Sequence, residues 1–135
     1  MLLVVDGNEL FSAIIAKGKT LNLFFDRRLG RVSPKFILKE FREHKSEIMK
    51  KSGLNEGDIF SFLILLTPKI EFFKTEDFDE FLEEAKEISP DPDDTEYFAL
   101  ALKLNCAIWS EDKEFKRQSR VKIYSTSDLL KELGL

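Results

Sequence analysis

The chain contains 135 residues, of which 43% are apolar and 34% charged, and its net charge is −4. This composition is typical of a globular protein, and the length fits one domain over residues 1–135 with a sizeable core. No apolar run reaches the roughly 20 residues that span a bilayer, and no secretory leader is evident. The single cysteine, Cys106, excludes an internal disulfide and a cysteine-built zinc site, and it fits a cytoplasmic location.

The N-terminal half alternates between strand and helix patterns. Apolar runs predict buried strands, and apolar residues at helical spacing predict helices. Ser33 and Pro34 form a typical helix start, with Ser33 as the N-cap and Pro34 in the first turn. The expected elements are strand 2–5, helix 8–17, a short helix 21–29, strand 31–33, helix 33–52 and helix 55–66.

The C-terminal half continues this alternation. The expected elements are an extended segment 68–73, an acidic helix 75–88, a rigid turn 89–92, helix 93–104, strand 106–110, a polar crossing 113–120, strand 121–124 and a final helix from about residue 127. Strands that alternate with helices predict a three-layer α/β/α sandwich with a central, mostly parallel sheet of four to five strands. We expect the 13 phenylalanines to fill much of its core.

Charge is distributed unevenly along the chain. Residues 1–51 carry 11 Lys and Arg against 6 Asp and Glu, whereas residues 52–96 carry 3 against 14. The basic segment could face a polyanion such as RNA, or the helix surfaces could simply differ in charge. The acidic segment 76–96 could bind a protein partner or only aid solubility.

Two of the predicted strands end in acidic residues. Asp6 follows strand 2–5, and Asp112 follows strand 106–110. Ligands of parallel α/β sheets gather just beyond the carboxyl ends of strands, so both carboxylates are candidates for a site. Each also has an ordinary structural interpretation, since Asp6 could cap the next helix and Asp112 could lie in a polar turn.

Two further carboxylates lie on predicted helices. Glu40 borders the apolar face of its helix, and Asp94 lies one turn before Phe98 on the buried side of another. Glu40 could instead be a surface residue. Asp91, Asp93 and Asp94 form a cluster in which a helix cap requires only one member, so at least one is free for another role.

Acids that converge raise one another's pKa unless a cation neutralises them. Only one histidine, His44, is present, and oxygen ligands without His or Cys suit a hard ion. The sequence therefore predicts a site for Mg²⁺ or Mn²⁺.

The ordered acids and their flanking residues resemble the motifs of the PIN-domain family, which includes the VapC toxins and related metal-dependent ribonucleases. The resemblance covers essentially the whole chain and is strongest to small single-domain proteins of prokaryotes, especially archaea. The matching segments are Leu3-Val4-Val5-Asp6-Gly7-Asn8, then Glu40, then Asp94-Thr95-Glu96-Tyr97-Phe98-Ala99-Leu100-Ala101, and finally Trp109-Ser110-Glu111-Asp112-Lys113-Glu114-Phe115.

The resemblance implies a role for each acid. Asp6, Glu40, Asp94 and Asp112 would be the catalytic acids around one or two Mg²⁺ or Mn²⁺ ions. Asp6, Asp94 and Asp112 would bind metal directly, while Glu40 would act through water or help to activate it. The supporting residues would be Asn8 and Ser110, which orient the carboxylates, and Asp93, which is the alternative to Asp94, with Asp91 as a further candidate.

The resemblance also implies an endoribonuclease that hydrolyses phosphodiester bonds of RNA, single-stranded or structured. It would be either a VapC-like toxin with an antitoxin partner or an RNA-processing enzyme, and a homodimer is expected. Two alternatives remain, namely a catalytically silent PIN module that binds RNA or protein, and a receiver-like protein that uses Asp6 and a metal. Six cations could bind the RNA backbone or could be ordinary surface residues. They are Lys17, Lys19, Arg27, Arg28, Lys113 and Arg117.

Overall fold

One parallel sheet of five strands forms the centre of the computed structural model, which describes all 135 residues. The strand order is β3-β2-β1-β4-β5, so the first strand of the chain lies in the middle. Every neighbouring pair is parallel. The strands are β1 (Leu2–Val5), β2 (Gly30–Pro34), β3 (Glu71–Phe73), β4 (Ala107–Trp109) and β5 (Ile123–Tyr124).

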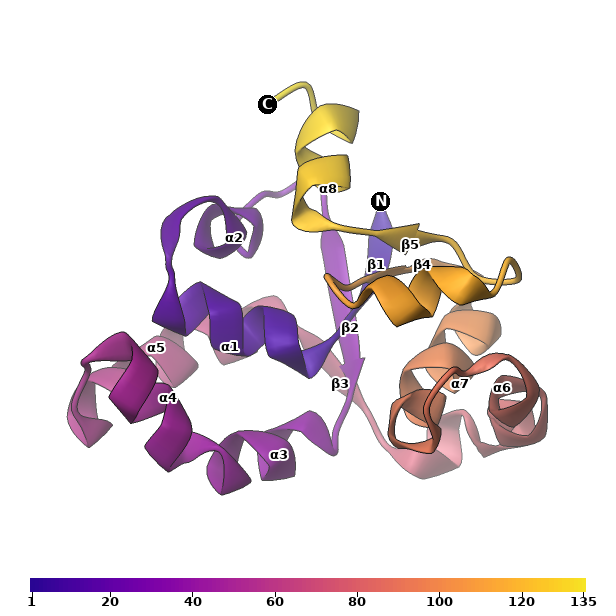
Figure 1. Cartoon of the computed structure of the whole chain (residues 1–135), viewed down its shortest axis with the longest axis horizontal. Helices are drawn as coiled ribbons and strands as arrows, with labels where there is room; N and C mark the ends of the chain where they lie inside the picture. The colour runs from indigo at the N-terminus through magenta and orange to yellow at the C-terminus, as the bar shows by residue number, and fades with distance from the viewer.

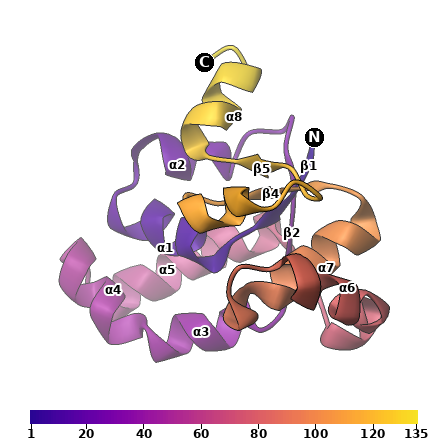
Figure 2. The ribbon, with the colours of Figure 1, turned by 45° about the vertical axis from the view of Figure 1, so that its right-hand side comes forward.

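Helices cover both faces of the sheet, as Figures 1 and 2 show. The helices α1 to α5 lie on one side and α6 and α7 on the other, which confirms the predicted three-layer sandwich. Helix α7 packs across β1, β2 and β4. The helices are α1 (Gly7–Ile15), α2 (Gly18–Leu23), α3 (Ile37–Glu43), α4 (Lys45–Ser52), α5 (Glu56–Leu66), α6 (Leu82–Ile88), α7 (Thr95–Leu104) and α8 (Thr126–Glu132).

Short 3-10 turns fill several of the connections between these elements. They are η1 (Thr67–Lys69), η2 (Thr75–Asp77), η3 (Asp79–Phe81), η4 (Pro92–Asp94) and η5 (Lys113–Arg117). None of the helices combines the length and the apolar character that a bilayer-spanning segment needs.

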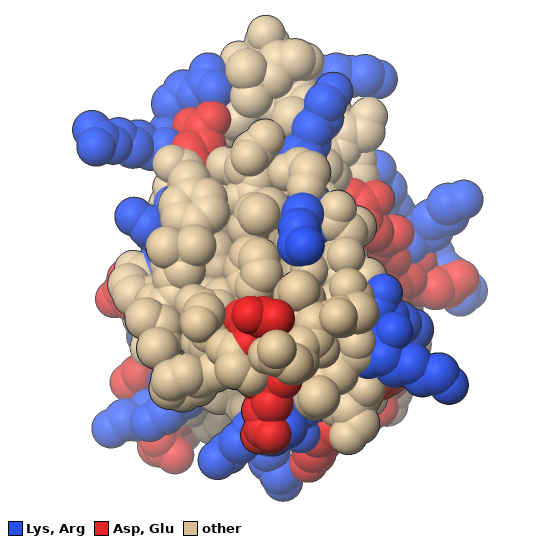
Figure 3. All heavy atoms as spheres, turned by 90° about the vertical axis from the view of Figure 1, so that its left-hand side faces the viewer, with Lys and Arg blue, Asp and Glu red and all other residues tan.

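The core is a cluster of 29 buried apolar residues between the layers. Aromatic rings pack against one another in it, with centroids 4.9 Å apart for Phe24 and Trp109 and 5.1 Å apart for Phe98 and Phe115. The phenylalanines do not all contribute, because Phe25 and Phe60 are exposed. Phe60 lies in α5, and Figure 3, which views the side of the molecule where Figure 1 places α2 and α5, shows a largely uncharged area there.

The single helix predicted for residues 33–52 is wrong. Ser33 and Pro34 belong to β2 instead, and the Ser33 hydroxyl donates a hydrogen bond to the Val5 carbonyl at 2.9 Å. Two helices follow, and the backbone leaves helical geometry between them at His44, with φ −99° and ψ 8°. The tertiary contact of Ser33 with β1 therefore prevails over the local helix-start signal.

The acidic helix predicted for residues 75–88 is regular only in α6. The turns η2 and η3 precede it, and between them Phe78 has φ −136° and a fully buried side chain. Burial of this ring in the core interrupts the helix.

The short helix predicted for residues 21–29 spans 18–23 instead, because the Asp26 side chain accepts the Arg28 N–H at 2.9 Å and turns the chain.

Candidate functional site

Asp6 follows β1 and caps the start of α1. Its Oδ1 accepts a hydrogen bond from the Asn8 N–H at 3.1 Å, and its Oδ2 accepts one from the Ser110 hydroxyl at 2.8 Å. The side chain is nearly buried, with 3% exposure. Burial raises the pKa of Asp6, the two hydrogen bonds lower it, and the charge of Asp112 raises it further. The cap interpretation is thus correct, but it accounts for only one of the two oxygens.

Ser110 connects the ends of two neighbouring strands. Its hydroxyl donates to Asp6 and accepts the Asp112 N–H at 3.0 Å. Asp112 itself is exposed, and its Oδ1 accepts the Glu114 N–H at 2.9 Å at the start of η5. Ser110 therefore holds the Asp112 backbone beside Asp6.

An open cavity of about 610 Å³ lies beyond this edge of the sheet, at the carboxyl ends of β1 and β2. It brings together five residues of the predicted site, namely Asp6, Asn8, Glu40, Asp93 and Asp94. Asp112 does not line the cavity, although its charge acts on both Asp6 and Asp94. The remaining lining residues are Phe36, Lys39, Glu43, His44, Pro92, Glu96 and Tyr97.

Another cavity of about 610 Å³ lies beside β5 and α8. Its two acids, Asp128 and Glu132, are balanced by three lysines, and Lys116 pairs with Asp128 at 3.0 Å. Its three lysines therefore more than offset its two acids. The acidic cavity, in which six carboxylates face a single lysine, is the stronger candidate for a site.

The carboxylates in the acidic cavity repel one another. Burial, followed by the charges of Asp6 and other nearby acids, raises the pKa of Asp94 to about 7. Burial and the charge of Asp6 also raise the pKa of Glu40, which the neighbouring His44 partly opposes. A divalent cation would relieve this repulsion, and a donor set made of oxygens fits Mg²⁺ or Mn²⁺.

The donor chemistry fits such an ion, but the side chains are not yet gathered around one point. No three acidic, histidine or cysteine side chains of the structure already lie close enough to hold one ion together. Binding would therefore require the exposed or half-buried carboxylates to rotate toward Asp6, whose own position is fixed by two hydrogen bonds.

The sequence interpretation missed two buried residues of this region. The Tyr97 hydroxyl accepts the Gly7 N–H at 3.0 Å, and burial and the charges of Asp6 and Glu40 raise the pKa of Tyr97. Glu9 is buried in α1, and burial raises its pKa to about 8. Helical spacing held a signal for Glu9, since it lies four residues before the buried Ala13.

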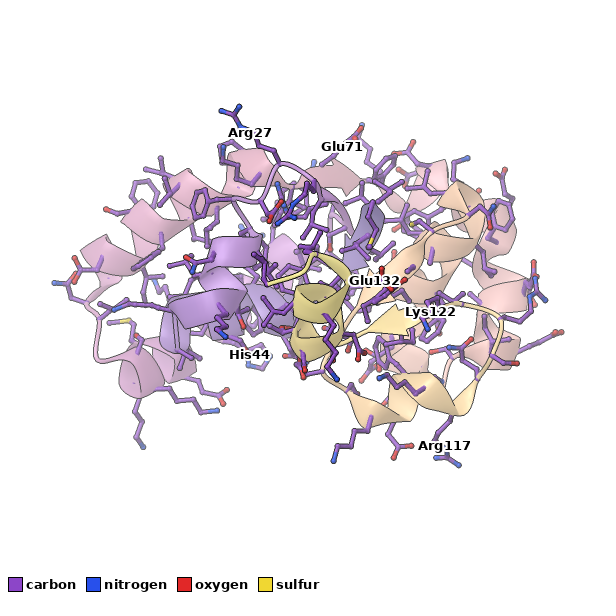
Figure 4. All side chains as sticks on the ribbon, turned by 90° about the horizontal axis from the view of Figure 1, so that it is seen from above. Arg27, His44, Glu71, Arg117, Lys122 and Glu132 are labelled. Carbon is purple, nitrogen blue, oxygen red and sulfur yellow. The ribbon has the colours of Figure 1, made fainter.

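The six cations predicted to grip RNA do not line the acidic cavity, which has Lys39 as its one Lys or Arg. Arg28 pairs with Asp26 at 2.7 Å, and Arg117 pairs with Glu114 at 2.6 Å. Figure 4 shows Arg27 and Arg117 pointing outward on opposite sides of the molecule. The other predicted cations, none of them at the cavity, are Lys17, Lys19 and Lys113.

Comparison with known proteins gives one family and a shared fold. The family model described as PIN domain matches residues 4–133. Similar solved structures include PAE2754 from Pyrobaculum aerophilum, with 15% identity and a TM-score of 0.70, covering 99% of this chain and 90% of that one. VapBC2 from Rickettsia felis, bound to a DNA fragment from its promoter, has 17% identity and a TM-score of 0.63, covering 93% and 98%. No curated protein matches the sequence.

Proposed function

This chain belongs to the PIN-domain family, and from that premise we propose that it is a metal-dependent endoribonuclease that hydrolyses phosphodiester bonds of RNA. The observation that carries the proposal is the convergence of Asp6, Glu40 and Asp94 on one open cavity. Burial is the main reason why the pKa of each of these three acids is raised, and the charge of Asp6 adds to the raised pKa of both Glu40 and Asp94, which supports a common site. The whole of residues 1–135 would serve as one PIN-like domain.

In this proposal Asp6, Asp94 and Asp112 hold one or two Mg²⁺ or Mn²⁺ ions. A bound ion supplies a water of lowered pKa and neutralises charge on the phosphate under attack. Glu40 orients or deprotonates the attacking water, Ser110 and Asn8 keep Asp6 in place, and Asp93 lies beside Asp94 as the alternative ligand.

The substrate we propose is RNA, single-stranded or structured, with its backbone beside the cavity. Lys39 is the cation placed to contact a phosphate there, since its ion pair with Glu43 is exposed and long, at 3.9 Å. The six cations identified in the sequence would contact only RNA that extends well beyond the cavity.

We propose two biological settings for this activity, the toxin of a toxin–antitoxin pair and an RNA-processing enzyme. The fold shared with VapBC2 and the family membership support the first. The enzyme would act in the cytoplasm in either setting.

The apolar face of α5 supports assembly with another protein chain. The helix has no charged residue from Ile59 to Leu66, yet Phe60, Ile64 and Leu65 are 63%, 59% and 51% exposed. A helix that is apolar all round is normally buried. A shallow hollow of about 330 Å³, lined in part by Leu54 and Phe62, lies beside these side chains.

We propose that a second copy of this chain covers that face in a homodimer. An uncharged face needs no oppositely charged partner and can pair with itself across a two-fold axis. The three exposed side chains offer roughly half of the ~800 Å² per subunit that a stable interface buries. An antitoxin would be the other occupant of the same surface.

A catalytically silent PIN module that binds RNA or protein is the second candidate. One observation favours it, since the carboxylates are not already gathered around a single point. A silent module should still bind RNA after the acids are substituted. It should cleave no RNA with any metal.

The decisive experiment is cleavage of a mixed single-stranded and structured RNA panel by purified protein with Mn²⁺, Mg²⁺ or EDTA. Asp6→Asn is the test variant, and Asp79→Asn, at an exposed acid outside the cavity, is its matched control. Metal-dependent cleavage that Asp6→Asn abolishes and Asp79→Asn retains would support the nuclease. Folded protein that cuts no RNA with any metal would support the silent module.

A further inference from the structure

Glu9 is a buried carboxyl that neither the fold nor the proposed chemistry uses directly. It lies on α1, three residues after Asp6, and its side chain is 1% exposed. Its Oε1 accepts the Glu111 N–H at 2.9 Å, across 102 positions of the chain. Its Oε2 is buried without a hydrogen-bond partner.

Stability alone does not account for a carboxyl at this position. The next residues on the same face of α1, Leu10, Ala13 and Ile14, are buried and apolar. An apolar side chain at position 9 would continue that face and would avoid the cost of a buried oxygen with no partner.

The residue that Glu9 holds lies at the centre of the loop that follows β4. The preceding residue, Ser110, donates a hydrogen bond from its hydroxyl to Asp6. The following residue, Asp112, donates its N–H to the Ser110 hydroxyl. The Glu111 side chain accepts the Thr126 N–H at 2.6 Å, which connects the loop to α8 on its other side. Asp6 caps α1, and Glu9 in that helix accepts the Glu111 N–H. Glu9 therefore fixes the loop that carries Asp112 to the helix that Asp6 caps.

We propose that Glu9 is a positioning residue, whose Oε1 holds the Ser110–Asp112 loop so that the Asp112 carboxylate can join Asp6 in binding a divalent cation. The proposal rests on the metal site of the proposed nuclease, but not on cleavage of any particular RNA. It assigns Glu9 no contact with metal or substrate.

Two substitutions separate positioning from charge and from packing. Glu9→Gln keeps an oxygen that can accept the Glu111 N–H but removes the ionisable carboxyl group. Glu9→Met keeps the length of the side chain and removes both the carboxyl group and the hydrogen-bond acceptor. Leu10→Ala is the control for a packing defect in α1, since Leu10 is buried beside Glu9 in the helix and lies in the apolar core.

The measurement is Mn²⁺ affinity of the purified variants by calorimetry or electron paramagnetic resonance, with Tm recorded on the same samples. We expect Glu9→Met to bind Mn²⁺ about 10- to 100-fold more weakly without a lower Tm, as when a group that orients a metal ligand is removed. Glu9→Gln should keep an affinity within about threefold of wild type, because the hydrogen bond is retained. Leu10→Ala should lower Tm and leave the affinity unchanged.

Wild-type affinity in Glu9→Met would overturn the positioning role. Equal losses in Glu9→Gln and Glu9→Met would also overturn it, because the effect would then not come from the hydrogen bond that Gln retains. Absence of Mn²⁺ binding by the wild-type chain would overturn both this inference and the proposed metal site. Mn²⁺ binding that follows the expected order, without RNA cleavage, would support the positioning role and count against the nuclease alone.

Discussion

The Ser110 hydroxyl lies 2.8 Å from Oδ2 of Asp6, although 104 positions separate the two residues in the chain. The parallel pairing of β1 with β4, in which Val5 is opposite Trp109, brings them together. The same hydroxyl accepts the Asp112 N–H at 3.0 Å. One small side chain thus sets the relative position of two of the candidate metal ligands.

Ser110→Ala should lower Mn²⁺ affinity, and any metal-dependent cleavage, by about 10- to 100-fold, because Asp6 and Asp112 lose their common partner. It should also lower the free energy of unfolding by about 1–3 kcal/mol, since a buried carboxylate loses a donor. Calorimetry and denaturant unfolding measure the two effects. Ser119→Ala, at an exposed serine, is the control and should change neither. An unchanged affinity in Ser110→Ala would contradict the bridging role.

The stability of the metal-free protein should fall as the pH rises through neutrality. The pKa of Asp94 rises from 3.8 to about 7 on folding, so the folded state binds this proton more tightly than the unfolded chain. Stability is therefore lost between those two values. The pKa values of Asp6 and Glu40 are raised as well, and Glu9, with a pKa of about 8, extends the effect to higher pH.

Thermal unfolding in EDTA from about pH 5 to about pH 8 tests this linkage. Asp94→Asn should flatten the decline in Tm, whereas the exposed-acid control Asp79→Asn should leave it unchanged. Mn²⁺ at 100 times the Kd measured at the higher pH should add about 2.7 kcal/mol there, and the same Mn²⁺ concentration should raise the Tm less at the lower pH, where the acids are protonated. A Tm that rises over this range and does not depend on Asp94 would contradict the raised pKa of Asp94 in the folded protein.

A methyl group added at Gly7 should conflict with Tyr97. An ideal Cβ at Gly7 would lie 3.0 Å from the Tyr97 hydroxyl oxygen, while the nearest atom of Ile37 would be at an ordinary 3.6 Å. Gly7→Ala should therefore cost about 1–3 kcal/mol of unfolding free energy by overpacking. Tyr97→Phe removes the conflicting oxygen, so Gly7→Ala should be nearly neutral or slightly stabilising in that background, since Ala favours a helix.

The double-mutant cycle measured by denaturant unfolding should give a coupling energy of about 0.5–3 kcal/mol. Effects that add within about 0.5 kcal/mol would mean that the backbone at Gly7 moves away and that the contact does not constrain the site.

Substitution of the apolar face of α5 should change the oligomeric state but not the stability. We expect the wild-type chain to be a dimer by light scattering and the Phe60→Ser/Ile64→Ser double variant to be a monomer. The free energy of unfolding of the variant monomer should change by no more than about 0.5 kcal/mol for each exposed site. Leu135→Ser, at a residue that is 67% exposed elsewhere, is the control and should remain dimeric. A monomeric wild-type chain would contradict the homodimer, and the apolar face of α5 would then be a surface for a different protein, such as an antitoxin.

The parts of this molecule that could be predicted from sequence are those with local signals. The run before Asp6 is apolar and the next residues are polar, so both the strand and the acid at its end were identifiable, and the same holds at Ser110 and Asp112. Alternation of such strands with helices was enough for the layered fold. The order of the acids and their flanking residues was enough for the family, which the family model confirms.

The parts that could not be predicted depend on contacts between distant segments. Ser33-Pro34 has the chemistry of a helix start, but a hydrogen bond to Val5, 28 positions away, holds Ser33 in a strand. The partner of Glu9 is 102 positions away, so its side chain could be placed on the buried face of a helix but not connected to Glu111. Pairings of this kind are settled only when the sheet forms.

The central position of β1 has a consequence for the timing of assembly. One of the two neighbours of β1, the strand β4, is made much later than β1 itself, because it begins more than 100 residues further along the chain, at Ala107. At a synthesis rate of about 5–20 residues per second, β1 waits about 5–20 s before that edge can pair. Until then Asp6 has neither its serine partner nor Asp112 beside it. A growing chain therefore has no complete acidic centre, and whatever reaction the centre performs begins only after β4 and the loop that follows it have been made.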